Sequence, residues 1–88
     1  MTKVITMTEE YKIEEIIEDA SNISNAELYD VLEDNEHLVL IFNDYLDKED
    51  EFIRDIKGHF SGFQNKKITI YKEEKPFMVE CAILKSEL

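Results

Sequence analysis

Hydrophobic residues recur along this chain with two spacings, and each spacing predicts a different kind of element. Between residues 8 and 20 they lie three or four positions apart, which is the spacing of a buried stripe on a helix. Thr8 suits the N-cap, and the glutamates after it suit the first turn, where the helix dipole favours negative charge. We therefore expect a helix over 8–20, preceded by a short strand over 3–7. The stripe comprises Ile13, Ile16, Ile17 and Ala20, and the solvent-facing arc comprises Glu14, Glu15, Glu18 and Asp19.

A second helix is expected between Ser24 and Asn35. Ser24 and Glu27 have the spacing of a capping box, and Ile23 and Leu28 have the spacing of a hydrophobic staple. Asn35 is a suitable residue for the C-terminal end. The expected inward face of this helix consists of Leu28, Val31 and Leu32.

The run HLVLIF at 37–42 is short, apolar and rich in strand formers, so it predicts a strand that is buried on both faces. A third helix follows, with Asp47 as its N-cap and with Gly58 or Gly62 at its end. Acidic residues occupy its expected first turn, namely Glu49, Asp50 and Glu51. Its expected inward face consists of Phe52, Ile53, Ile56 and Phe60.

The last third of the chain changes to alternating hydrophobic and polar positions, which is the period of a strand. Two such segments, 67–72 and 77–84, flank a turn at 73–76 and predict a hairpin. Together the elements predict an α+β fold of order (β)ααβαββ, with helices on one face of a small, mainly antiparallel sheet. At 88 residues the chain suits one domain, residues 1–88.

Composition adds an expected cellular setting. Cys81 is the only cysteine, so no intrachain disulfide is possible and a reducing, cytoplasmic location is expected. No apolar run has the length of a signal segment or of a membrane span.

The net charge of −11 is concentrated in one part of the chain. Residues 9–55 hold 17 acidic and 3 basic residues, whereas the rest of the chain holds 4 acidic and 7 basic residues. No lysine or arginine occurs between Ile13 and Asp47. Such a field repels nucleic acid and anionic membranes and steers the protein toward basic surfaces.

Catalytic and metal-binding patterns are poorly represented. His37, His59 and Cys81 are 22 residues apart in each interval, which is unlike the paired spacing of zinc ligands. No glycine occurs between Asn43 and Lys57, where a calcium loop would need one. Nucleophile and phosphate-binding motifs are also missing from the sequence. We therefore expect a protein that is not an enzyme and that uses no metal or other cofactor.

Two interpretations of the acidic residues remain open. Acids on amphipathic helices keep many small proteins soluble. However, a solubility surface usually intersperses both signs of charge, and this one does not. The alternative is nucleic-acid mimicry, because closely spaced carboxylates on a rigid frame approach the charge density of duplex DNA and fit a basic groove.

The C-terminal run AILKSEL, residues 82–88, resembles the tails of small acidic anti-CRISPR proteins from phages of Gram-positive bacteria. These proteins inhibit Cas9, and several of them end in a similar L-K-S-E-L run. The run EDEF at 49–52 resembles an acidic segment that helps one of them occupy the PAM-reading pocket. The resemblance implies a phage-encoded anti-CRISPR protein that acts in the host cytoplasm and blocks DNA binding or cleavage by a Cas effector with guide RNA.

The resemblance also implies a binding site, because Cas9 reads the PAM with arginines that carboxylates can bind in bidentate fashion. Candidate residues are Asp47, Glu49, Asp50 and Glu51, followed by Glu33, Asp34 and Glu36. Two other functions remain open. One is inhibition of a different nucleic-acid enzyme. The other is an adaptor with an apolar contact face that includes exposed tyrosines, which are enriched at binding hot spots. The tyrosines concerned are Tyr11, Tyr29 and Tyr45.

Overall fold

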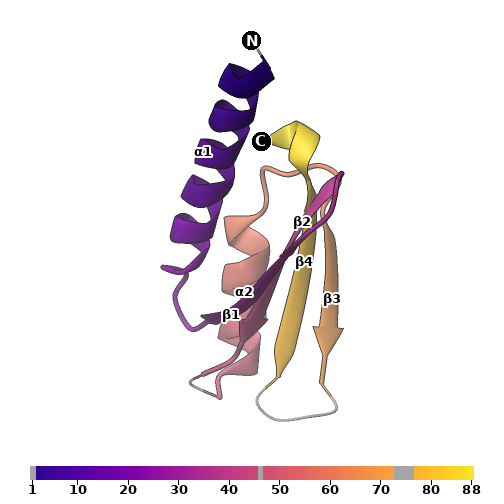
Figure 1. The fold of residues 1–88 in the computed structure, drawn as a ribbon. Helices are drawn as coiled ribbons and strands as arrows, with labels where there is room; N and C mark the ends of the chain where they lie inside the picture. The colour runs from indigo at the N-terminus through magenta and orange to yellow at the C-terminus, as the bar shows by residue number, and fades with distance from the viewer. Residues whose placement is uncertain (1, 46, 73–76) are drawn as a thin grey trace.

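Two helices pack on one face of a four-stranded antiparallel sheet (Figure 1). This computed structural model describes residues 2–45, 47–72 and 77–88, and it describes the side chains from residue 11 onward. In chain order the elements are α1 (Thr2–Ala20), β1 (Glu27–Glu33), β2 (His37–Asn43), α2 (Glu49–His59), β3 (Lys67–Tyr71), β4 (Met78–Leu84) and a short 3-10 helix, η1 (Lys85–Glu87). The α+β class and the placement of the helices on one face agree with the sequence prediction.

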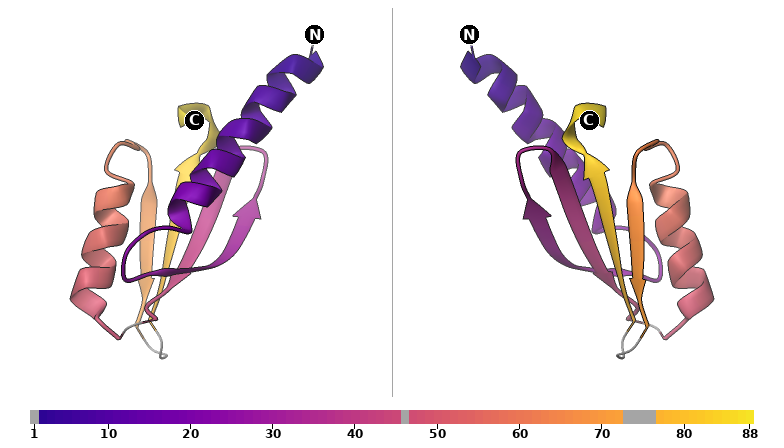
Figure 2. Two further views of the ribbon diagram at one scale, coloured as in Figure 1. Left: turned by 90° about the vertical axis from the view of Figure 1, so that its left-hand side faces the viewer. Right: turned by 90° about the vertical axis from the view of Figure 1, so that its right-hand side faces the viewer.

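The sheet has the strand order β1-β2-β4-β3, and each neighbouring pair is antiparallel. Alternate residues of the two central strands are fully buried, and these residues face the helices. The prediction that 37–42 is buried on both faces is wrong, because the intervening residues of β2 are only half-buried. They are half-buried because, within the described chain, both α-helices lie on the opposite face of the sheet (Figure 2, right).

The core lies between this sheet and the two helices. Phe60, at the end of α2, is completely buried and has ring contacts with Phe42 of β2 and with Phe63, both at a centroid distance of 6.0 Å. The other completely buried side chains of the core are Ala20, Leu38, Leu40, Phe42, Phe52, Ile56, Val79, Cys81 and Ile83. The inward stripe predicted for the first helix also packs against this core.

Helix α1 begins at Thr2, so the prediction of a strand over 3–7 is wrong. The β-branched residues Val4, Ile5 and Thr6 favoured the prediction of a strand, but no turn residue separates them from the helix-forming residues that follow. Adding a residue to an existing helix is far easier than starting a new element, so the helix extends through the segment. Figure 2 shows the N-terminal part of α1 projecting beyond the sheet.

The helix predicted between Ser24 and Asn35 is also wrong, because this segment forms β1 and the turn into β2. A β-bulge between Leu28 and Asp30 places an extra residue in β1. Leu28 and Val31 consequently both pack on the core although they lie three positions apart, a spacing that imitates a helix. Leu32, which was predicted to face inward, is 50% exposed.

Helix α2 forms as predicted, but Asp47 is not its N-cap. The N-cap is Lys48, and Asp47 has a left-handed backbone conformation with φ of 55°. Buried Asp44 fixes this segment, because its Oδ1 accepts a hydrogen bond of 3.0 Å from the backbone N–H of Lys48. The helix ends at His59, so Gly58 lies within its last turn rather than beyond it.

The predicted hairpin forms from β3 and β4, and its turn at 73–76 lies outside the described residues. Neither helix of the described chain combines the length and the apolar character that a membrane crossing requires.

Candidate acidic binding surface

Helix α1 presents a row of carboxylates to solvent, as its sequence pattern predicted. Glu14, Glu15, Glu18 and Asp19 are all exposed. Within the described part of the chain, none of the four has an ion-pair partner. Among the α1 residues whose side chains are described, 11–20, the only base is Lys12, whose Nζ donates a 3.2 Å hydrogen bond to the main-chain oxygen of Leu88. Among the side chains that the structure describes, no ion pair therefore neutralises these four carboxylates.

Strand β1 continues the acidic surface along one edge of the sheet. Glu27 and Asp30 are exposed, and no ion pair involving either is present among the described residues. α1 crosses the half of the sheet that contains β1 and β2, so these carboxylates and those of α1 belong to the same half of the molecule (Figure 2). We call the set Glu14, Glu15, Glu18, Asp19, Glu27 and Asp30 the α1–β1 acidic surface.

The predicted cluster Glu33, Asp34 and Glu36 lies at the β1–β2 turn, where most of its polar groups support the fold. Glu33 forms an ion pair with Lys85. Oδ1 of Asp34 accepts hydrogen bonds from the backbone N–H groups of Glu36 (2.8 Å) and His37 (2.6 Å). These two bonds favour the charged form and lower the pKa of Asp34. Among the three, the Glu36 carboxylate has no such role within the described chain.

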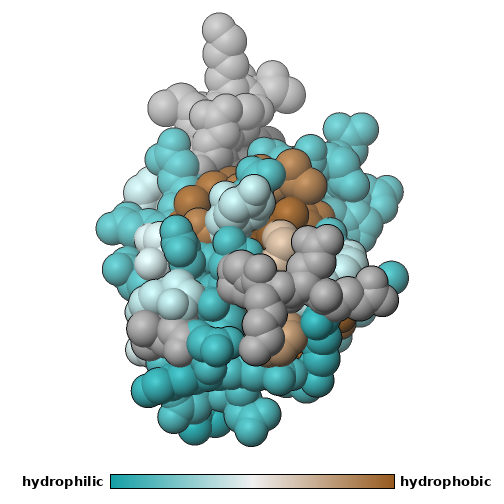
Figure 3. Space-filling view, turned by 90° about the horizontal axis from the view of Figure 1, so that it is seen from below, coloured by the Kyte–Doolittle hydropathy of each residue, from teal (hydrophilic) through white to brown (hydrophobic). Residues whose placement is uncertain are grey.

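The predicted cluster at the start of α2 is partly neutralised by lysines. Glu49 Oε1 lies 2.7 Å from Lys72 Nζ, and Glu51 Oε2 lies 3.7 Å from Lys48 Nζ. The hydrogen bond that Lys72 donates to Glu49 raises the pKa of Lys72, and the negative charges of Glu49 and Asp50 add to the effect. Asp50 is exposed. Asp47, the fourth predicted residue, is exposed in the preceding turn. The end of the molecule that holds this turn is largely hydrophilic (Figure 3).

The structure does not bring the two predicted clusters together. One precedes β2 and the other follows it, so they lie at opposite ends of the strands (Figure 1). β2 runs from His37 to Asn43, and at about 3.3 Å per residue it separates the clusters by about 20 Å. A single small pocket on a partner cannot contact both.

The C-terminal segment 82–88, on which the family resemblance rests, contacts the β1–β2 turn and the core. The backbone N–H of Lys85 donates a 2.8 Å hydrogen bond to the carbonyl of Glu36, and its side chain, only 13% exposed, pairs with Glu33. Leu88 packs against the core. These contacts hold η1 against the β1–β2 turn.

Glu87 fastens the same tail to the loop between α2 and β3. Its two carboxylate oxygens accept hydrogen bonds from the backbone N–H groups of Gln64 (2.9 Å) and Asn65 (3.1 Å). These bonds lower the pKa of Glu87, because they stabilise its charged form. The L-K-S-E-L run thus has a structural explanation in this fold, independent of any partner.

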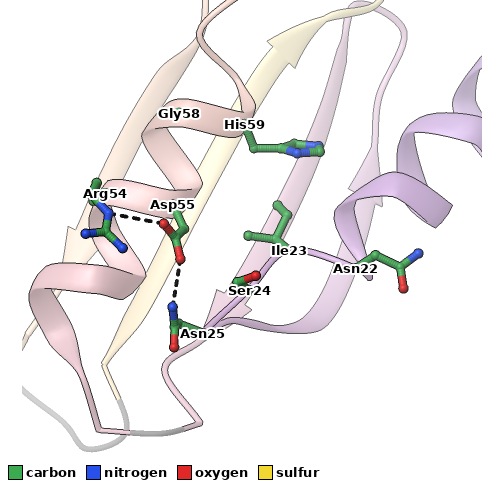
Figure 4. A pocket seen from close by; sticks show the side chains of 8 residues that line it. All are labelled: Asn22, Ile23, Ser24, Asn25, Arg54, Asp55, Gly58 and His59. Atoms are coloured by element: carbon green, nitrogen blue, oxygen red, sulfur yellow. Dashed lines mark hydrogen bonds and ion pairs between the residues drawn. The ribbon is translucent and has the colours of Figure 1, made fainter.

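A shallow groove of about 760 Å³ separates α2 from the α1–β1 loop (Figure 4). Asn25, which has a left-handed φ of 61°, donates a 2.8 Å hydrogen bond from Nδ2 to Oδ2 of Asp55. Oδ1 of Asp55 accepts a 3.2 Å hydrogen bond from Nε of Arg54. The hydrogen bond from Asn25 is the main cause of the lowered pKa of Asp55, with Arg54 contributing. This network joins the loop to α2.

No group of three or more histidine, cysteine or acidic side chains that suits a metal ion occurs among the described residues. Cys81 is buried in the core, and burial raises the pKa of its thiol to about 11, so it is a packing residue rather than a nucleophile. Tyr11, Tyr29 and Tyr45 are 68%, 64% and 53% exposed, as the adaptor hypothesis requires.

Sequence reasoning missed Asp44, Lys85, Glu87 and Asn25. Asp44 precedes α2 by five residues and had the same cap-forming chemistry as Asp47, but the sequence does not reveal which of the two is buried. Lys85 and Glu87 pair with residues that are 52 and at least 22 positions away, and sequence patterns carry no signal for such contacts.

Comparison with known proteins supplies no relative: no protein-family model, no curated protein and no solved structure matches the chain.

Proposed function

We propose that this protein is a phage-type anti-CRISPR protein that docks its α1–β1 acidic surface in the basic nucleic-acid channel of a Cas9-type effector. The observation that carries the proposal is the distribution of neutralising partners. The six carboxylates of the α1–β1 acidic surface have no cationic partner among the described residues, whereas Glu33, Glu49 and Glu51 are paired with lysines.

Unpaired carboxylates matter because each one repels its neighbours in the free protein. Clustered like charges lower stability, and a basic partner relieves this repulsion when it binds. A basic groove that holds DNA has arginines and lysines spaced to contact phosphates. When the acidic protein binds there, its carboxylates replace the phosphates as partners of these side chains, and a similar number of counterions is released. The bound inhibitor then excludes DNA from the groove.

The resemblance at residues 82–88 supports the choice of a Cas effector over other basic proteins. Because these residues make contacts within the fold, we take the resemblance as support for a shared ancestry and architecture. We assign the contact surface from the distribution of charge instead. The proposal therefore moves the primary contact from Glu49–Glu51 to α1 and β1, and it retains exposed Asp50 as a secondary contact.

The test compares two double variants that change the net charge equally. Glu14→Lys with Glu18→Lys reverses charge on α1, and Asp50→Lys with Glu51→Lys reverses charge on α2. Each variant and the wild type are added to guide-loaded Cas9 before or after a PAM-containing duplex, and cleavage is measured. Circular dichroism confirms that each variant is folded.

We expect wild-type protein to inhibit only when added before DNA, and we expect the α1 variant to lose inhibition while the α2 variant keeps most of it. Loss in the α2 variant alone would return the site to the start of α2. Equal inhibition by all three proteins would contradict an acidic docking surface. Inhibition in either order of addition would contradict competition with DNA.

A second candidate function is a protein–protein adaptor, which the exposure of Tyr11, Tyr29 and Tyr45 favours. Its contact would depend on apolar area and would hold at high salt, whereas the affinity of a nucleic-acid mimic falls steeply. Replacing Tyr29 with serine separates the two, because only the adaptor depends on that ring.

A further inference from the structure

No helix of the described residues covers the face of the sheet that points away from α1 and α2 (Figure 2, right). Alternation along β2 and β4 places on it the residues between the fully buried ones, and the strand pairing aligns them in rows. Leu32 of β1 extends this surface and is 50% exposed. The half-buried aliphatic residues of this outer face are Val39, Ile41, Met78, Ala82 and Leu84.

The carboxylate of Glu80 lies in the middle of this aliphatic surface, and the pairing of Asp30 with Ile41 places a second carboxylate at its β1 edge. Glu80 of β4 pairs with Ile41 on one side and with Thr69 on the other. It is half-buried, and its Oε2 accepts a 2.8 Å hydrogen bond from the hydroxyl of Tyr71. No cation is paired with Glu80 in the part of the chain that the structure describes, although Lys67 lies on the same face. Tyr71 thus orients a carboxylate that has no ion pair with any described residue.

This carboxylate determines what can cover the face. A second copy of the chain would place its own Glu80 nearby, because the residue lies on a central strand and packed sheets are only about 10 Å apart. Two half-buried carboxylates in an apolar interface repel each other strongly. The net charge of −11 on each copy adds to that repulsion. A cationic partner has the opposite effect.

We propose that the outer face binds a basic segment of a partner protein, which places an arginine on Glu80 and apolar side chains on the surrounding aliphatic residues. Arginine fits better than lysine because its planar fork donates two hydrogen bonds to a carboxylate, is weakly hydrated and stacks on an aromatic ring such as that of Tyr71. The inference rests on the proposed function only in taking the partner to be a basic protein. It assigns a surface centred on Glu80, which adjoins the α1–β1 acidic surface at Asp30.

The test uses the peptide acetyl-Leu-Arg-Leu-amide as the probe, with acetyl-Leu-Glu-Leu-amide as the matched control. Each peptide is titrated into isotope-labelled protein, and backbone amide shifts are followed by NMR. Three proteins are compared: the wild type, Glu80→Gln, and the α1 variant Glu14→Lys with Glu18→Lys. Gln at position 80 keeps an acceptor for the Tyr71 hydroxyl, so it removes the charge and preserves the local geometry.

We expect the arginine peptide to shift the amides of Val39, Ile41, Glu80 and Ala82, and the glutamate peptide to leave them unchanged. Glu80→Gln should weaken binding about tenfold, since it removes a charge-assisted pair. The α1 variant should bind as the wild type does. Shifts confined to α1, equal affinity of Glu80→Gln, or no saturable shift would each overturn the inference. None of these results depends on inhibition of a Cas effector, so failure of the proposed function is recognised separately.

Discussion

The ion pair between Lys85 and Glu33 provides a quantitative test of the structural role assigned to the C-terminal tail. The Lys85 side chain is 13% exposed and that of Glu33 is 47% exposed, so the pair lies between a surface and a buried one. Surface pairs contribute about 0.2–1 kcal/mol, and breaking a buried pair costs about 3–5 kcal/mol. Because solvent screens Glu33, we expect Lys85→Met to reduce the free energy of unfolding by about 1–2 kcal/mol.

A double-mutant cycle isolates the pair from other effects of each change. Lys85→Met, Glu33→Gln and the double variant are unfolded in urea and followed by far-ultraviolet circular dichroism. We expect a coupling energy of at least about 0.5 kcal/mol, the lower end of the range for residues in contact. Additive effects would refute the contact. A domain of 88 residues has a stability of about 4–13 kcal/mol, so the variants remain folded and should retain partner binding. Loss of binding by folded Lys85→Met would place the tail in the binding site.

Three further predictions concern the core, the pH dependence of stability and the thiol. Phe60→Ala should lower the free energy of unfolding by about 3–5 kcal/mol, because it empties a completely buried site, and Phe60→Leu should cost clearly less; equal urea midpoints would contradict the packing. Because the pKa of Glu87 is lowered in the folded state, the folded chain binds fewer protons at Glu87 than the unfolded chain does at acidic pH. The contribution of Glu87 to stability is therefore fully present above the ordinary pKa of 4.5 and is lost as pH falls through the lower folded pKa. Urea unfolding at a series of acidic pH values should therefore show a steeper loss of stability for the wild type than for Glu87→Gln, and identical slopes would count against the hydrogen bonds to Gln64 and Asn65. Burial of Cys81 and its raised pKa of about 11 predict that Ellman's reagent labels the folded protein far more slowly than the urea-unfolded protein, and rapid labelling of the folded protein would contradict the described core.

The sequence predicted the elements whose periodicity is local and uninterrupted. Helix α2 combines an acidic first turn with a regular apolar stripe, and strands β2, β3 and β4 alternate or are continuously apolar, so each was recognised. β1 was missed because its bulge gives Leu28 and Val31 a helical spacing. The bulge is a consequence of pairing with β2 and has no separate signal in the sequence.

The candidate site was predictable as a charge distribution and not as a set of contacts. The count of carboxylates identified the acidic half of the chain. The helical period also correctly predicted that four α1 carboxylates are exposed, namely Glu14, Glu15, Glu18 and Asp19. Which carboxylates are neutralised depends on lysines brought in from other elements, as Lys72 is brought to Glu49 and Lys85 to Glu33. The pairing of these carboxylates with lysines changes the expected contact surface, and only the tertiary structure shows which carboxylates are paired.

The central claim is that the α1–β1 acidic surface of this chain occupies a basic nucleic-acid channel. The most direct measurement is the affinity of the wild-type protein for guide-loaded Cas9, determined by calorimetry at about 50 mM and about 200 mM salt. Our account predicts binding at the lower concentration and a loss of at least tenfold in affinity at the higher one, since counterion release drives such contacts. No binding at low salt, or an affinity that salt leaves unchanged, would contradict it.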